Sequence, residues 1–135
     1  MKRSHLTIAV VFAIAVLMTS AVAQTGAIKA NIPFDFTIAR QTFAAGEYKV
    51  AVQGTMLQLV RLDGTGSAYL QYNLSAHNKD VSPRLIFHRY GTRSFLSQVW
   101  ITETGHELIA SPREIEYART DKQDQVVVLA SVLTR

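Results

Sequence analysis

The sequence predicts an all-β domain, an antiparallel sandwich or small barrel of about seven strands with one short helix before the last strand. Three observations support this class. Apolar and polar residues alternate with a period of two in several segments, turn-forming residues recur about every ten residues, and a single segment carries the signals of a helix start. The chain has 135 residues, 48% of them hydrophobic, which suits one domain with its own core.

The residues before position 24 differ in composition from the rest of the chain. Lys2 and Arg3 form a basic start, Leu6 to Met18 is an uncharged apolar run, and Ala21-Val22-Ala23 supplies small residues. This order is typical of a secretory signal peptide, in which the apolar run enters the membrane and the small residues fit the peptidase. We therefore expect cleavage between Ala23 and Gln24.

Cleavage would leave a single β-rich domain over residues 24–135, exported to the periplasm or the extracellular space. The alternative is an uncleaved anchor, since the segment 6–23 is about long enough to span a bilayer as a helix. Without Lys2 and Arg3 the chain has 12 basic and 10 acidic residues, a net charge of +2. This weak charge argues against nucleic acid as a partner, and membrane contact is expected only through the signal segment before cleavage.

The first predicted strand covers residues 28–38. Ile28, Ala30, Ile32, Phe34, Phe36 and Ile38 occupy every second position, with mainly polar residues between them. Such alternation predicts a strand with one buried and one solvated face. Because Pro33 has no N–H to donate, we expect an edge strand or a bulge at this position.

Five further strands follow in the same pattern. Asp63-Gly64 is the strongest hairpin signal among their connections, and residues 75–83 form a polar stretch that predicts the longest surface loop. Glu103-Thr104-Gly105 is interpreted as a break after the sixth strand. The five strands are expected at residues 47–53, 55–62, 67–74, 84–90 and 94–101.

The helix is predicted over residues 112–120. Ser111 is a favourable N-cap, Pro112 a favourable first residue, and the Glu114 carboxylate is placed to reach back to the N–H of Ser111. A helix this short needs tertiary packing, which we expect through Ile115 and either Ala118 or Tyr117. It would cover one open end of the sandwich or barrel.

The last strand, residues 125–133, contains the run Val126-Val127-Val128-Leu129. An uncharged β-branched run without proline is prone to aggregate if its edge is exposed. We therefore predict that this strand is paired on both sides, with the 28–38 strand as a neighbour.

Four blocks of the chain carry a resemblance. They are Ile32-Pro33-Phe34-Asp35-Phe36, Ala45 to Val50, Leu85 to Gly91 and Phe95 to Trp100, and they cover most of the region after the signal together with Glu107-Leu108 and Ser111 to Glu114. In this order they resemble a family of small secreted bacterial proteins of unknown function. The resemblance implies an exported β-rich domain and brings no activity, cofactor or catalytic residue.

Catalytic and metal-binding signatures are weak. The chain has no cysteine, which excludes disulfides, thiolate metal sites and a thiol nucleophile. His77, His88 and His106 lie in different segments without zinc-ligand spacing, so no metal is expected. No serine stands in a nucleophile elbow, and nothing selects a pair among the carboxylates Asp35, Glu47, Glu103 and Glu107. We expect neither a cofactor nor an enzyme.

The most suggestive surface is basic and aromatic. Its residues crowd one predicted hairpin, between positions 84 and 101; they are Arg84, His88, Arg89, Tyr90, Arg93 and Trp100. If the faces of the two strands coincide, aromatic rings could stack on a sugar or anchor a peptide, with arginine binding an anion. The alternative is that Tyr90 and Trp100 fill the core under arginine stems.

Two function classes follow, with a third less favoured. The leading hypothesis is an exported noncatalytic domain of the cell envelope or extracellular space that binds a protein or glycan partner. The alternative is a carrier with a small ligand in a barrel cavity. A hydrolase is the least favoured. A filled interior would favour the binding domain, and an open mouth beside Trp100 would favour the carrier.

Overall fold

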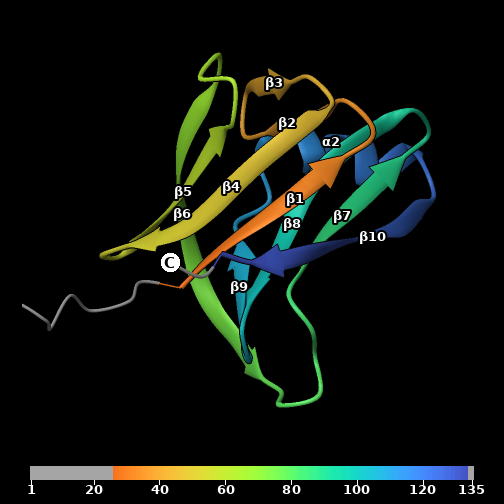
Figure 1. The fold of residues 1–135 in the computed structure, drawn as a ribbon. Helices are drawn as coiled ribbons and strands as arrows, with labels where there is room; N and C mark the ends of the chain where they lie inside the picture. The colour runs from red at the N-terminus through yellow and green to blue at the C-terminus, as the bar shows by residue number, and fades with distance from the viewer. Residues whose placement is uncertain (1–25, 134–135) are drawn as a thin grey trace, which may run out of the picture.

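A computed structural model of the chain describes residues 26–133 and shows a closed antiparallel β-barrel (Figure 1). The predicted signal peptide and its cleavage site lie outside the described residues. The described part has ten strands and one helix. In chain order they are β1 (Ala27–Ile32), β2 (Phe36–Ile38), β3 (Gln41–Phe43), β4 (Gly46–Gln53), β5 (Met56–Arg61), β6 (Ser67–His77), β7 (Arg84–Tyr90), β8 (Arg93–Ile101), β9 (Thr104–Leu108), α2 (Pro112–Thr120) and β10 (Gln123–Val132).

Eight strands close the barrel in the order β8-β7-β10-β1-β4-β5-β6-β9, because β9 pairs back onto β8. The short strands β2 and β3 are additional to these eight. They form a hairpin, and β2 pairs with the start of β8 through one parallel pair, Thr37 with Phe95. The all-β class and the helix before the last strand are therefore confirmed, and the architecture is a barrel.

The first predicted strand is two strands. β1 ends at Ile32, and the chain turns through Pro33, Phe34 and Asp35 before β2 begins, which pairs with β3 and β8 rather than with the neighbours of β1. Proline cannot donate to a ladder, and the Asp35 side chain instead accepts a hydrogen bond from the Ala45 N–H at 2.9 Å. The predicted continuous strand over residues 28–38 is wrong at this point.

The strand β9 is a further difference from the sequence prediction. Thr104 and Gly105, interpreted as a break, are its first two residues, and β8 and β9 form a tight hairpin with Ile101 paired to Thr104. The turn between them places Thr102 at φ 57°, a left-handed conformation that glycine or asparagine usually supplies. A threonine there gives no hairpin signal, so the pattern was missed.

The core lies inside the barrel and is filled by side chains. Its largest fully buried members are Tyr48, Phe36, Phe87, Ile28, Ile32, Leu57, Leu59, Leu85, Val50 and Val99. Phe36 makes edge-to-face contacts with both Tyr48 and Phe87, with ring centroids 5.2 and 5.5 Å apart. Phe34, also expected in the core, is half-buried and rests with its ring 4.9 Å from that of Phe87.

Helix α2 has the predicted bounds and N-cap. The Ser111 hydroxyl accepts the Glu114 N–H at 3.2 Å. The expected packing is present for Tyr117, which lies 6.0 Å from Phe95, and wrong for Ile115 and Ala118, which are exposed; Glu114 is buried in their place. Glu114 and Tyr117 face the outer surface of β7 and β8, so the helix covers a side of the barrel rather than an open end (Figure 1).

Strand β10 lies between β7 and β1, as predicted. The two neighbours pair with different parts of it: β7 with Gln123–Leu129, and β1 with Ala130 to Val132. The run Val126 to Leu129 is thus paired along one edge only, so the predicted pairing on both sides is wrong for this run, and Leu129 is 70% exposed. The barrel closes because β10 changes partner along its length.

Candidate binding groove

The barrel wall is open between β6 and β8 over part of its height. β9 fills the space between these two strands only as far as Leu108, which pairs with Tyr72 of β6, and on the β8 side only from Gln98 onward. Beyond these residues β8 takes β2 as its neighbour. The segment Ser67 to Gln71 of β6 pairs with β5 on one side and faces a gap on the other.

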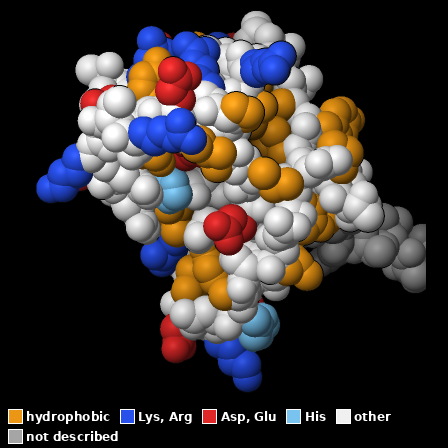
Figure 2. Space-filling model, turned by 180° about the vertical axis from the view of Figure 1, so that it is seen from behind, with side chains coloured by type: hydrophobic (Ala, Val, Ile, Leu, Met, Phe, Trp, Pro, Cys, Tyr) orange, Lys and Arg blue, Asp and Glu red, His pale blue; other side chains and the backbone are white. Residues whose placement is uncertain are grey.

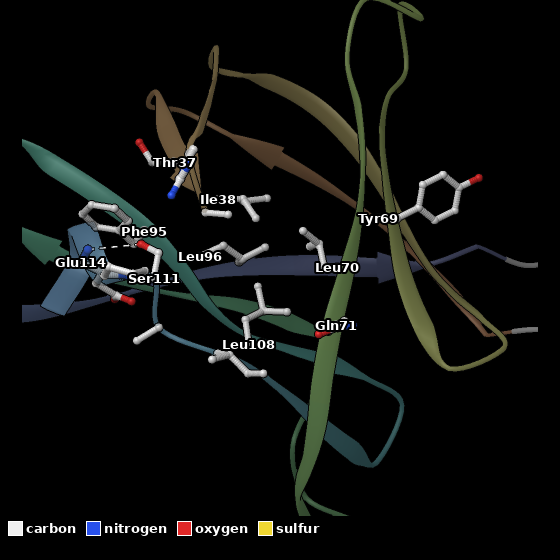
Figure 3. Close-up of a pocket in the computed structure, with 15 residues that line it drawn as sticks. Thr37, Ile38, Tyr69, Leu70, Gln71, Phe95, Leu96, Leu108, Ser111 and Glu114 are labelled. Atoms are coloured by element: carbon white, nitrogen blue, oxygen red, sulfur yellow. Dashed lines mark hydrogen bonds between the residues drawn. The ribbon is translucent and has the colours of Figure 1, made fainter.

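This gap forms a groove of about 490 Å³ (Figure 3). The side chains of Leu70, Leu96 and Leu108 converge in it from three strands, with Ile38 beside them, while Tyr69 points away. Leu70 and Leu96 are core residues, so the floor of the groove is the core itself. The lining comprises Thr37, Ile38, Ala39, Arg40, Tyr69, Leu70, Gln71, Phe95, Leu96, Leu108, Ile109, Ala110, Ser111, Pro112 and Glu114.

The rim of the groove is also apolar. Ile109 is 65% exposed, and the lining residues Ala110 and Pro112 that follow it are also exposed. The rear view of the molecule shows apolar side chains gathered at the surface among charged ones (Figure 2). An apolar depression with a few polar groups is the usual composition of a binding site.

One end of the groove carries a buried carboxylate. Glu114 lies at the start of α2, and its Oε1 is 3.3 Å from His88 Nδ1 and accepts a hydrogen bond of 3.5 Å from the Tyr90 hydroxyl. Burial raises the pKa of the Glu114 carboxyl, and the contacts with His88 and Tyr90 oppose that rise. Burial, followed by the Glu114 charge, raises the pKa of Tyr90. Glu114 thus anchors the helix to the barrel and borders the groove at the same time.

The six residues of the predicted basic and aromatic patch do not form one continuous surface. On the outer face, the register pairs Arg84 with Trp100, while His88 lies opposite Phe95 further along the hairpin, so the two faces do coincide. The patch is nevertheless divided, because α2 covers Tyr90 and part of His88, and Trp100 packs against Gly105. None of the six lines the groove.

The arginines of that hairpin make local contacts. Arg84 donates to the backbone and side-chain oxygens of Ser82, Arg93 stacks 5.1 Å from the ring of Tyr117, and Arg89 stacks 4.7 Å from the ring of Phe34. Arg89 points to the inner face, where it also donates to Ser94. Their role in binding stays a prediction from the sequence.

The three histidines His77, His88 and His106, which lack zinc-ligand spacing in the sequence, also lie apart in the structure. His77 pairs with Glu103 at 3.3 Å, His88 with Glu114, and the buried His106 with the Val99 carbonyl at 3.2 Å. Within residues 26–133, no three histidine or acidic side chains stand close enough to hold a metal ion.

Sequence reasoning missed the groove because it missed β9. In the sequence, Leu70, Leu96 and Leu108 resemble ordinary core residues. They line a groove only because β9 ends at Leu108 and leaves the neighbouring part of β6 unpaired. One signal was present: residues 67–76 contain neither a charge nor a proline, which is unusual for a strand with a free edge.

No protein-family model, curated protein or solved structure matches this chain. Among the described residues, no helix combines the length and apolar character that a membrane crossing requires.

Proposed function

We propose that this protein is an exported, noncatalytic binding domain of the cell envelope or extracellular space, and that a partner protein occupies the groove between β6 and β8. The observation that carries the proposal is the opening in the barrel wall, which leaves core leucines at the floor of a groove with an apolar rim. The signal-like first 23 residues support export.

The packed interior supports a partner at the surface rather than a ligand in the barrel centre. Tyr48, Phe36, Phe87 and the aliphatic residues around them fill the space that a barrel carrier would leave empty. A small apolar molecule is the second candidate, because the volume of the groove falls within the range of small-molecule sites, about 300–1,000 Å³. It would bind in the same groove.

Filling the groove with a large side chain tests the proposal. Ala110 is exposed, lies outside any strand or helix and lines the groove, so Ala110→Trp adds an indole there with little strain. Thr55→Trp in the β4–β5 turn adds the same group away from the groove and is the matched control. Both variants are exported, purified and used to capture partners from an envelope extract, and the wild-type protein is also examined by native mass spectrometry.

The proposal predicts a partner protein captured by wild type and by Thr55→Trp and lost with Ala110→Trp. Capture that is equal for all three proteins would contradict the groove as the site. A small molecule that co-purifies with wild type and is absent from Ala110→Trp would establish the carrier instead.

A further inference from the structure

We infer that the groove takes an extended peptide segment of the partner, which adds as a strand to the free edge of β6. The inference rests on the proposed function and specifies its ligand. Its first basis is the backbone of Ser67 to Gln71. β5 pairs with this segment on one side, and no described strand pairs with it on the other.

An unpaired strand edge presents a row of N–H and C=O groups, and another extended chain is the natural complement of that row. A glycan or a lipid tail would cover the leucines but could not satisfy the regular spacing of the backbone groups. The chemistry of the edge therefore favours a peptide over the other ligand classes.

The path for such a strand already exists in the barrel. β9 runs antiparallel to β6 and ends where Leu108 pairs with Tyr72, after which the chain turns away through Ile109 and Ala110 toward α2. A peptide beside Ser67 to Gln71 would continue the line of β9. Five residues give it a length of about 17 Å.

The groove beside this edge defines the sequence that would bind. Alternate side chains of a strand point to opposite faces, so every second residue of the peptide would face Leu70, Leu96 and Leu108. Those residues should be apolar. The residues between them would face solvent on the side to which Tyr69 points.

The edge also lacks the protection that free strands usually carry. Natural edges are blunted by charges, proline or bulges near their free groups. Residues 67–74 contain no charged residue and no proline, and the only irregularity of β6 lies further along, between Leu74 and Ala76 where β9 already pairs. An unguarded edge beside an apolar groove is what strand addition requires.

A phage-displayed library of random dodecapeptides provides the probe. Peptides selected on the wild-type protein are synthesised, and their binding is measured for wild type, Ala110→Trp and the control Thr55→Trp. Amide hydrogen exchange is then compared with and without peptide. We expect apolar residues at alternate positions of the selected peptides, and exchange about tenfold slower at unpaired amides within residues 67–71. Ala110→Trp should weaken binding at least about tenfold, and Thr55→Trp should leave it unchanged.

Several results would overturn the inference. One is a library that yields no peptide able to slow exchange within residues 67–71. Another is a dimer of the protein whose formation alone slows these amides, which would assign the edge to a second copy. Exchange in β1 and β4 shows that each variant is folded. If Ala110→Trp loses the envelope partner while no peptide protects the edge, the groove remains the site and only strand addition fails.

Discussion

Glu114 is the residue on which the helix and the groove both depend. The residue is 6% exposed and lies three positions after the N-cap Ser111, and its carboxylate contacts His88 and Tyr90. The sequence correctly indicated Ser111 as the cap. It assigned the carboxylate to the Ser111 N–H, whereas the structure turns it toward the barrel, because only there does it meet an imidazole and a phenol.

The raised pKa of Glu114 predicts a pH-dependent stability. A carboxyl whose pKa is higher in the folded state than its ordinary value of 4.5 favours folding below that value, and the contribution is lost as the pH rises through the raised pKa. Glu114→Gln removes this titration. Relative to Glu114→Gln, the wild-type free energy of unfolding should therefore fall as the pH rises above about 4.5, measured by urea titration at a series of pH values.

Glu116→Gln is the control for this experiment, since Glu116 is exposed on the same helix. The difference between that variant and wild type should change little with pH. A wild-type free energy that rises relative to Glu114→Gln over the same interval would show that the contacts with His88 and Tyr90 outweigh burial.

Phe36 and Asp35 offer a second test at the scale of the residue. Phe36 is 1% exposed and contacts three other aromatic rings, so Phe36→Ala should reduce the free energy of unfolding by about 3–5 kcal/mol. Asp35→Ala loses one exposed hydrogen bond to Ala45 and should cost about 1 kcal/mol. Equal losses in a denaturant titration would mean that Phe36 does not lie in the core.

At the scale of the element, the β8–β9 hairpin determines where the groove begins. Trp100 and Gly105 are paired across it, and a Cβ atom on Gly105 would lie 2.7 Å from a ring carbon of Trp100 and 2.7 Å from Ser75 Oγ. Glycine at position 105 is therefore required by the close approach of the indole and of β6. This contact holds β9 between its two neighbours.

Gly105→Ala should consequently lower the free energy of unfolding by about 1–3 kcal/mol, the usual cost of forcing an atom into a packed contact. Gly66→Ala is the matched control, because its Cβ would meet Phe43 at an ordinary 3.6 Å and the change should stay within about 0.5 kcal/mol. Equal stability of the two variants would show that the pairing of β8 with β9 is looser than described.

Some of these elements could be predicted from the sequence and others could not. Strands with clear period-two patterns and the capped helix were predictable, because burial on one face and the N-cap both leave local signals. The break at Pro33 and the strand β9 were not predictable. In β9 and the turn before it, Thr102 in a left-handed conformation and Gly105 at a crowded strand pairing resemble loop residues in the sequence. The groove depends on β9 and on contacts between distant segments, so it was out of reach.

The proposed export of the whole chain places the domain in the periplasm or the extracellular space. The predicted signal peptide implies a mature protein that begins at Gln24. When the full chain is produced in a bacterium with its export pathway, the intact mass of the exported protein should lack residues 1–23. A full-length species extracted only with detergent would favour the membrane-anchor alternative.

The barrel wall is open beside the first half of β6, and hydrogen exchange of the free protein measures this opening directly. A strand paired on one side leaves alternate amides without a partner, whereas a strand between two neighbours protects them in succession. We predict fast exchange at alternate positions within residues 67–71, and protection in succession along residues 48–51 of β4, which pair with both β1 and β5. Uniform protection from Ser67 to Leu74 would contradict the open wall, and with it the groove as a binding site.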